Sequence, residues 1–310
     1  MMKRMLSLLL TLLLLGSACL AETPGANPPT LYDASDILGM DTHYYIYDRD
    51  FFESEDSQPG TLVKTKYTSN VYEKPVKKTV NVYLPYGYDE NGTERYPVIY
   101  FFHGRGCDVD TLLGNPETKN ALDHMISSGM VRPFILVAGT YYYDMRKNLS
   151  DMDKFAIELR TEIMPLVEGM YRTYAETTDE AGLQASRNYR AISGFSMGSM
   201  TTWSLFDDTL DICANYLPFS GGTSDIEAIT NAIDETNLDF YIYMACGGEE
   251  DTAFSGCNAL AQTLAADTAH FSYGPDRETN NFFYCLSDNI HQDLTSRYYL
   301  YNAFIDGLFQ

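Results

Sequence analysis

The stretch Gly194-Phe195-Ser196-Met197-Gly198 lies between a short apolar run and a helix-like segment. Residues 189–193 have the composition of a buried strand, and residues 198–208 have the apolar spacing of a helix. A strand, a G-x-S-x-G turn and a helix together expose a nucleophilic serine at the edge of a sheet. Glycine is needed on both sides of the serine, because a Cβ there would clash with the adjoining strand and helix. The sequence therefore predicts Ser196 as a nucleophile; the alternative is an ordinary turn rich in glycine and serine.

Strands and helices alternate outward from this motif. Continuous apolar runs such as residues 98–102 indicate strands covered on both faces. Apolar residues recur every four positions in residues 151–169, where Pro165 predicts a kink. The pattern predicts an α/β fold with a mostly parallel central sheet, helices on both faces and an antiparallel start. The expected strands are 62–67, 79–84, 98–102, 134–138, 189–193, 214–219, 239–245 and 281–286, and the expected helices are 117–128, 151–169, 198–208, 225–234, 257–266 and 294–307.

A serine nucleophile needs a base to take its proton, and the base needs a third group to orient it. In hydrolases with a nucleophile elbow, the acid and then the histidine follow the serine along the chain. Only His270 and His291 follow Ser196. His270 precedes the last expected strand, whereas His291 follows it, at the carboxyl edge where such sites lie. We therefore predict His291 as the base; the alternative is a surface histidine in an acidic loop.

The acid is expected after the strand at 239–245. The loop that follows contains Glu249, Glu250 and Asp251. Adjacent carboxylates cannot all face one imidazole. We predict Asp251 as the acid, with Glu250 as the second candidate and the remaining carboxylates in solvent.

Two backbone N–H groups are needed to stabilise the oxyanion. Met197, directly after the nucleophile, is expected to supply one of them. The other is expected from Arg105, in the loop His103-Gly104-Arg105-Gly106 that follows the strand at 98–102. We expect His103 to form structural hydrogen bonds. For the Arg105 side chain, substrate contact and plain exposure both stay open. This chemistry needs no cofactor and no metal.

The amino-terminal segment is typical of a secretory signal. A charged start, an apolar run over residues 5–15 and a small-residue zone predict a signal peptide at 1–21, and hence a secreted protein. Cys19 follows Gly16-Ser17-Ala18, which leaves a lipid anchor as the alternative. Residues 22–55 are interpreted as an amino-terminal arm or linker, and residues 56–310 as a single catalytic domain.

The formal net charge of −22 argues against nucleic acid and anionic membranes as partners. No segment after the signal is apolar for long enough to span a membrane. Export permits disulfides. Cys246 and Cys257 flank the loop that bears the predicted acid, so a disulfide between them and two buried free thiols both stay open.

Several segments, in this order, resemble the esterase family that contains the family 1 carbohydrate esterases and the esterase D-like hydrolases, in the α/β-hydrolase superfamily. The resemblance covers about residues 60–310 and implies an α/β-hydrolase fold. In that family the aspartate of a G-x-x-D loop completes the triad, which supports Asp251. One position departs from the family pattern, since Ile290 replaces the usual glycine before the histidine. The matching landmarks are residues 80–88, 97–106, 190–198, 248–254 and 281–302.

The same resemblance implies a substrate class, because secreted members cleave feruloyl or acetyl esters of plant xylan. We therefore expect a feruloyl esterase whose partners are plant cell-wall polysaccharide esters or feruloylated oligosaccharides. The alternatives are an acetyl xylan esterase, an acyltransferase on the same fold and a non-catalytic carbohydrate-binding relative. Tyr141 and Tyr142 follow the fourth strand and are predicted to line an aryl pocket, although 25 tyrosines make chance placement an equal alternative.

Overall fold

The computed structural model describes residues 49–287 and 289–309. The predicted signal peptide at 1–21, Cys19 and residues 22–48 of the predicted arm lie outside the described residues.

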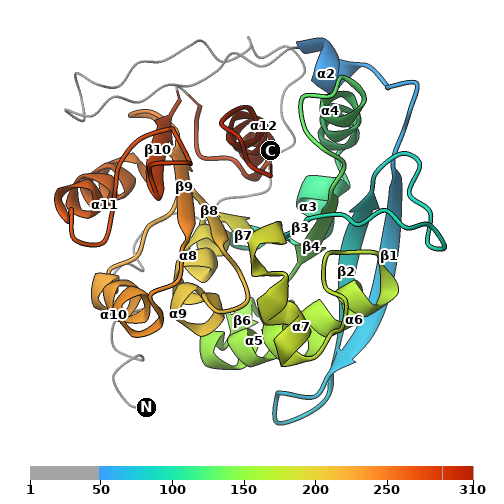
Figure 1. The fold of residues 1–310 in the computed structure, drawn as a ribbon, viewed down its shortest axis with the longest axis horizontal. Helices are drawn as coiled ribbons and strands as arrows, with labels where there is room; N and C mark the ends of the chain where they lie inside the picture. The colour runs from blue at the N-terminus through green and yellow to red at the C-terminus, as the bar shows by residue number, and fades with distance from the viewer. Residues whose placement is uncertain (1–48, 288, 310) are drawn as a thin grey trace.

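The core of the molecule is an eight-stranded sheet with the strand order β1-β2-β4-β3-β7-β8-β9-β10 (Figure 1). The six strands from β4 to β10 in this order run parallel, and β1 and β2 are antiparallel, as the sequence predicts. The strands are β1 (Thr61–Ser69), β2 (Val76–Leu84), β3 (Val98–Phe102), β4 (Ile135–Gly139), β7 (Arg190–Phe195), β8 (Asn215–Phe219), β9 (Tyr241–Cys246) and β10 (Phe282–Leu286); β5 (Tyr142–Asp144) and β6 (Leu149–Ser150) form a separate small ribbon.

Helices cover both faces of the sheet. Successive strand residues point to opposite faces, and here both faces carry apolar side chains, so each face needs a covering layer. In β3, Tyr100 packs into one apolar cluster, whereas Ile99 and Phe101 pack into the other. The first cluster is covered by α5 (Met152–Glu158), α6 (Met164–Met170), α7 (Glu180–Ala185), α8 (Met197–Ser204), α9 (Phe206–Thr209), α10 (Ile226–Thr236) and α11 (Phe254–Ala266). The second is covered by α2 (Arg49–Glu53), α3 (Asp110–Leu113), α4 (Pro116–Ser127) and α12 (Ser296–Ile305).

The expected helix at 151–169 is interrupted near Pro165. A π-helical turn, Leu159–Ile163, separates α5 from α6, and Pro165 lies in the first turn of α6. Proline lacks an N–H group, and its ring crowds the carbonyl four residues earlier. That carbonyl lies within the π-helical turn, which is wider than an α-helical turn. The irregularity predicted at Pro165 is therefore a change in helix type.

The described end of the predicted arm packs on the domain. Phe52 in α2 is buried, and its ring lies 5.1 Å from the Tyr298 ring, centroid to centroid. The Phe52 carbonyl accepts a hydrogen bond from the Asn120 side chain at 3.1 Å. Residues 49–53 are therefore held against α4 and α12.

The structure decides between the two alternatives for the cysteines near the acid loop. Cys246 and Cys257 are both buried free thiols. Burial raises the pKa of the Cys246 thiol well above its ordinary value. No disulfide joins the two residues, so β9 and α11 are held together by packing.

Candidate active site

Ser196 sits in a sharp turn between β7 and α8. Its backbone has φ 54° and ψ −112°, a conformation that residues other than glycine rarely adopt. A Cβ on Gly194 would lie 2.4 Å from the carbonyl carbon of Gly198, and one on Gly198 would lie 1.9 Å from the Phe102 carbonyl oxygen. Glycine is therefore required on both sides of the serine, which is the elbow geometry that the sequence predicts.

Three side chains from separate loops form one hydrogen-bonded chain. The Ser196 Oγ lies 2.9 Å from His291 Nε2, and His291 Nδ1 lies 2.7 Å from Asp251 Oδ1. Figure 1 shows β7, β9 and β10 in one sheet. The three residues follow these strands in the chain, so all three lie at the carboxyl edge of the parallel strands. The structure thus brings together the serine, base and acid that sequence reasoning selected.

The Asp251 carboxylate is fully enclosed and well satisfied. It accepts hydrogen bonds from the Ala253 N–H at 2.8 Å, the Gly247 N–H at 3.2 Å and the Ser220 Oγ at 2.7 Å. Burial by itself raises the pKa of Asp251, but the hydrogen bond and charge of His291, together with these donors, bring that pKa below its ordinary value. The carboxylate is therefore ionised when it meets the imidazole.

The rejected candidates lie elsewhere. Glu249 and Glu250 are exposed, so the second candidate for the acid points into solvent. His270 pairs with Asp267 at 2.6 Å and with Asp234 at 3.4 Å, ahead of β10. Its pKa is raised, chiefly by the hydrogen bond with Asp267.

Sequence reasoning missed Ser220. This residue follows β8 and has a positive φ of 49°. Its hydroxyl donates to the Asp251 carboxylate, and its backbone N–H donates to the Ala245 carbonyl at 2.8 Å. The one available signal was its place at the carboxyl end of a parallel strand, which many polar residues share.

The loop after β3 leaves one N–H group available between two that are engaged. The Gly104 N–H donates to Asp293 Oδ1 at 2.6 Å, and the Gly106 N–H donates to the Tyr142 hydroxyl at 3.2 Å. Within the described chain, neither the Arg105 N–H nor the Met197 N–H has an acceptor. The Arg105 side chain is exposed. Two free donors, one in this loop and one at the start of α8, therefore remain for a ligand.

His103 has a structural position, as expected. It is buried, with its ring nitrogens 2.8 Å from the Thr140 Oγ1 and 2.8 Å from the Gly104 carbonyl oxygen. Burial lowers its pKa to about 4. The ring is therefore neutral near pH 7 and supports the loop that carries Arg105.

Tyr141 and Tyr142 do not present open faces. Both are fully buried, and their rings pack against His103 with centroids 5.0 and 5.4 Å from its own. The Tyr142 hydroxyl contacts the Gly106 N–H and lies 4.0 Å from the Met197 Sδ. The expectation that both line an aryl pocket fails for Tyr141, because the direction of its side chain buries it in the core. Tyr142, by contrast, is among the residues that line the groove described next.

A groove of about 1100 Å³ opens beside this loop. Tyr72 and Tyr143 form an aromatic pair in its wall, with ring centroids 5.3 Å apart. Asp108 and Thr140 also line it and connect it to the segments that follow β3 and β4. Neither Ser196 nor Arg105 lines it, but its walls include residues that follow β3 and β4 at the carboxyl edge of the sheet, which makes it the candidate groove for a substrate.

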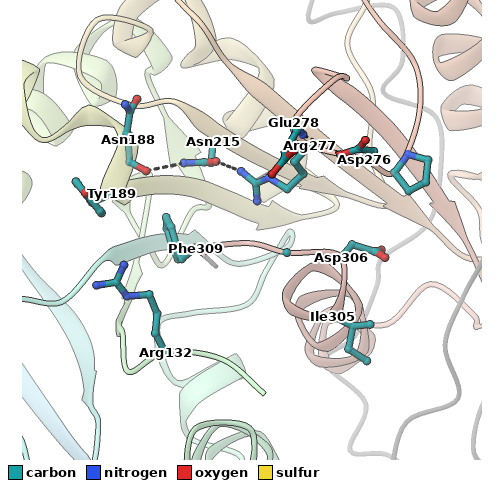
Figure 2. A pocket seen from close by; sticks show the side chains of 12 residues that line it. Arg132, Asn188, Tyr189, Asn215, Asp276, Arg277, Glu278, Ile305, Asp306 and Phe309 are labelled. Atoms are coloured by element: carbon teal, nitrogen blue, oxygen red, sulfur yellow. Dashed lines mark hydrogen bonds between the residues drawn. The ribbon is translucent and has the colours of Figure 1, made fainter. Parts of the chain in front are cut away.

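A second hollow, of about 750 Å³, lies at the opposite edge of the sheet (Figure 2). Its residues Asn188, Asn215 and Arg277 precede β7, begin β8 and precede β10, respectively. The Arg277 guanidinium donates to the Asn215 side chain and stacks on the Tyr241 ring at 4.2 Å. This hollow is at the amino ends of the strands and belongs to no part of the serine site.

The described residues contain no cluster of histidine, cysteine or carboxylate side chains able to hold a metal ion. Across the same residues, no helix is long and apolar enough to cross a bilayer.

A mostly parallel sheet flanked by helices, with a serine elbow and an acid and a histidine on later loops, defines an α/β-hydrolase fold. A family model described as Esterase matches residues 73–205. A mutant of the feruloyl esterase module from Clostridium thermocellum, solved in complex with sinapinate, is 32% identical, with a TM-score of 0.78 over 86% of this chain and 94% of the module. This chain belongs to the esterase family that includes the family 1 carbohydrate esterases.

Two longer relatives also match this chain. Endo-1,4-beta-xylanase Y of Acetivibrio thermocellus is 34% identical over 257 residues, which are 79% of this chain and 23% of the xylanase. An endo-1,4-beta-xylanase/feruloyl esterase of Xylanibacter ruminicola is 28% identical over 74% of this chain and 30% of its own length. The chain therefore spans less than a third of the length of either relative.

Proposed function

We propose that this protein is a serine carboxylic-ester hydrolase that removes hydroxycinnamoyl groups, such as feruloyl groups, from plant cell-wall xylan. The observation that carries the proposal is the hydrogen-bonded chain from Ser196 through His291 to the enclosed Asp251. A hydroxyl in such a chain can lose its proton to the imidazole as it attacks a carbonyl.

The mechanism follows from the geometry. Ser196 Oγ attacks the ester carbonyl carbon while His291 Nε2 takes the hydroxyl proton, and Asp251 stabilises the resulting imidazolium. The N–H groups of Arg105 and Met197 stabilise the tetrahedral oxyanion. The imidazolium then protonates the departing sugar oxygen, which leaves an acyl group on Ser196. Water, activated by the same imidazole, releases the acid and restores the serine.

The substrate class rests on the relatives and on the groove. One relative is a feruloyl esterase module complexed with sinapinate, and another is named xylanase/feruloyl esterase. Tyr72 and Tyr143 line the groove as an aromatic pair, and aromatic rings stack well on a phenyl ring. The net charge of −22 favours a neutral polymer over a polyanion.

We also propose that the protein is exported. The amino-terminal signal pattern at 1–21 supports this, and so does a polymeric substrate that a cell cannot take up. Mass spectrometry of protein recovered from the culture medium tests it. A mature chain that begins at residue 22 is expected, whereas a lipid on Cys19 would point to the anchored form.

The substrate proposal is tested by comparing kcat/KM for methyl ferulate with kcat/KM for acetylated xylooligosaccharides. We expect methyl ferulate to be preferred. A clear preference for the acetylated oligosaccharides would make the protein an acetyl xylan esterase, and inactivity toward both would contradict the proposal.

A further inference from the structure

Asp293 lies two residues after His291, on the loop between β10 and α12, and its side chain reaches the loop after β3. Its Oδ1 accepts the Gly104 N–H at 2.6 Å, a short distance typical of a charge-assisted hydrogen bond. Its Oδ2 lies 3.3 Å from the Cys107 sulfur. One carboxylate therefore connects the loop of His291 to the loop of Arg105.

The Asp293 carboxylate and Gly104 are in close contact. A Cβ on Gly104 would lie 2.5 Å from Asp293 Oδ2 and 2.9 Å from Oδ1, so the carboxylate packs directly on the glycine Cα. The close approach fixes the position of Gly104 and not only its hydrogen bond. The close contact with Asp293 therefore explains why residue 104 is a glycine.

Asp293 is one of three supports around the free N–H of Arg105. The Tyr142 hydroxyl accepts from Gly106 on the far side, and the His103 ring bonds the Gly104 carbonyl from beneath. With the peptide groups on both sides of Arg105 fixed, the direction of its N–H is fixed as well. Preorganised donors are effective in catalysis because they need no reorganisation during the reaction.

We propose that Asp293 is a positioning residue that holds Gly104 so that the Arg105 N–H faces the oxyanion formed on Ser196. This inference rests on the proposed esterase function. Asp293 touches neither the substrate nor the reacting atoms; it acts through the loop. The essential property is a hydrogen-bond acceptor at the Oδ1 position, which an asparagine also supplies.

The surroundings of Asp293 also affect its own pKa. Burial raises the pKa of Asp293 to about 6, against the lowering effects of the Gly104 N–H and the His291 charge. The other groups that face it are the Tyr141 phenol, whose pKa Asp293 helps to raise, and the sulfur of Cys107. These contacts hold the Asp293 carboxylate between the loop that follows β10 and the loop that follows β3.

The test compares Asp293→Ala with Asp293→Asn on methyl ferulate. The alanine variant loses the acceptor, and we expect kcat to fall by about 10- to 100-fold with a much smaller change in KM. The asparagine variant keeps an acceptor, and we expect it to recover most of the kcat at pH 8. Asp179→Ala is the matched control, because it removes a carboxylate that accepts a backbone N–H from Gly182 on α7. Asp179→Ala should have the wild-type kcat.

Amide hydrogen exchange over residues 103–107 provides a readout that does not need a substrate. We expect faster exchange of the Gly104 N–H in Asp293→Ala and near wild-type exchange in Asp293→Asn. Equal kcat for Asp293→Ala and wild type, or equal loss in both variants, would overturn the inference. Wild-type inactivity toward esters, combined with the predicted exchange pattern, would instead remove the proposed function and leave the loop contact standing.

Discussion

Two serines in the site have backbone conformations that residues other than glycine rarely adopt. Ser196 has φ 54° and Ser220 has φ 49°, and each such residue costs about 1–3 kcal/mol. Ser196 carries the proposed nucleophile, and Ser220 donates to the proposed acid. The strain is therefore located at the two ends of the same hydrogen-bonded chain. At each end the unusual backbone conformation directs the serine hydroxyl toward its partner in that chain.

His291→Ala should lower kcat by roughly 10⁴- to 10⁶-fold, because the serine and its base act as a unit. His270→Ala is the matched control, since that imidazole also pairs with a carboxylate but lies ahead of β10. Steady-state hydrolysis of methyl ferulate measures both. Loss of activity in His270→Ala with normal turnover in His291→Ala would reverse the assignment of the base.

Asp251→Asn should lower kcat by about 10³- to 10⁴-fold, because an amide can hold the imidazole in the wrong tautomer and cannot stabilise the imidazolium. Glu249→Gln and Glu250→Gln are the controls and should retain wild-type turnover, since both side chains are exposed. A defect confined to Glu250→Gln would move the acid by one residue.

Asp293 should also lower the stability of the protein near neutral pH. A carboxyl whose pKa is raised in the folded state to about 6, from 3.8, binds more protons folded than unfolded, so its contribution to stability falls as pH rises through that range. At pH 7 or above, the ionised Asp293 lowers the free energy of unfolding by about 3 kcal/mol, at 1.36 kcal/mol per pKa unit. Asp293→Asn should therefore be more stable than wild type at pH 7.5 and similar to it near pH 4. Urea unfolding at the two pH values checks this, and an equal difference at both would contradict the raised pKa.

At the scale of elements, the site depends on how closely β3, β7 and α8 approach one another. The start of α8 lies against the end of β3, with no room for a Cβ on Gly198. The same Cβ would lie 2.9 Å from the His103 carbonyl oxygen, so the start of α8 also packs against the loop after β3. A side chain at residue 198 would push α8 away from this loop and so separate the two N–H groups that we propose as oxyanion donors.

Gly198→Ala should destabilise the protein by about 3 kcal/mol or more, because the added Cβ meets backbone rather than a movable side chain. Gly256→Ala is the matched control in α11, where an added Cβ meets nothing within 4 Å. Since alanine favours a helix over glycine, Gly256→Ala should stabilise by about 0.5 kcal/mol. Chemical denaturation measures both; equal effects on the free energy of unfolding would contradict the close packing at the elbow.

The elements that local patterns determine were predictable from the sequence. The apolar run at 98–102 coincides with β3, and the order of strands and helices placed Ser196, Asp251 and His291 at one sheet edge. The sequence did not predict the contacts that depend on loop paths. Asp293 reaches Gly104 across 189 positions, and no local pattern encodes that approach. Tyr141 and Tyr142 both follow the expected strand, but Tyr142 lines the groove whereas Tyr141 is buried in the core, since a position after a strand does not fix the direction of a side chain.

At the scale of the whole molecule, the sheet separates two hollows of different character. The groove lined by Tyr72 and Tyr143 opens where the parallel strands β3 and β4 end, whereas the hollow in Figure 2 opens where β7, β8 and β10 begin. The buried Arg190–Glu168 pair, with nitrogen and oxygen 2.7 Å apart, and the buried Lys78–Glu158 pair, at the same distance, tie strands to α5 and α6 on one face. These fixed helices and strands form a rigid support for loops that carry the chemistry.

The most direct test of the account is the turnover of methyl ferulate by Ser196→Ala, with folding checked by thermal unfolding. The change removes one oxygen atom, and the hydrogen bond it breaks is that to His291. We predict a folded protein whose kcat is lower by at least about 10⁴-fold, with residual catalysis from the oxyanion donors alone. Hydrolysis by a folded Ser196→Ala variant at the wild-type rate would contradict the assignment of Ser196 as the nucleophile.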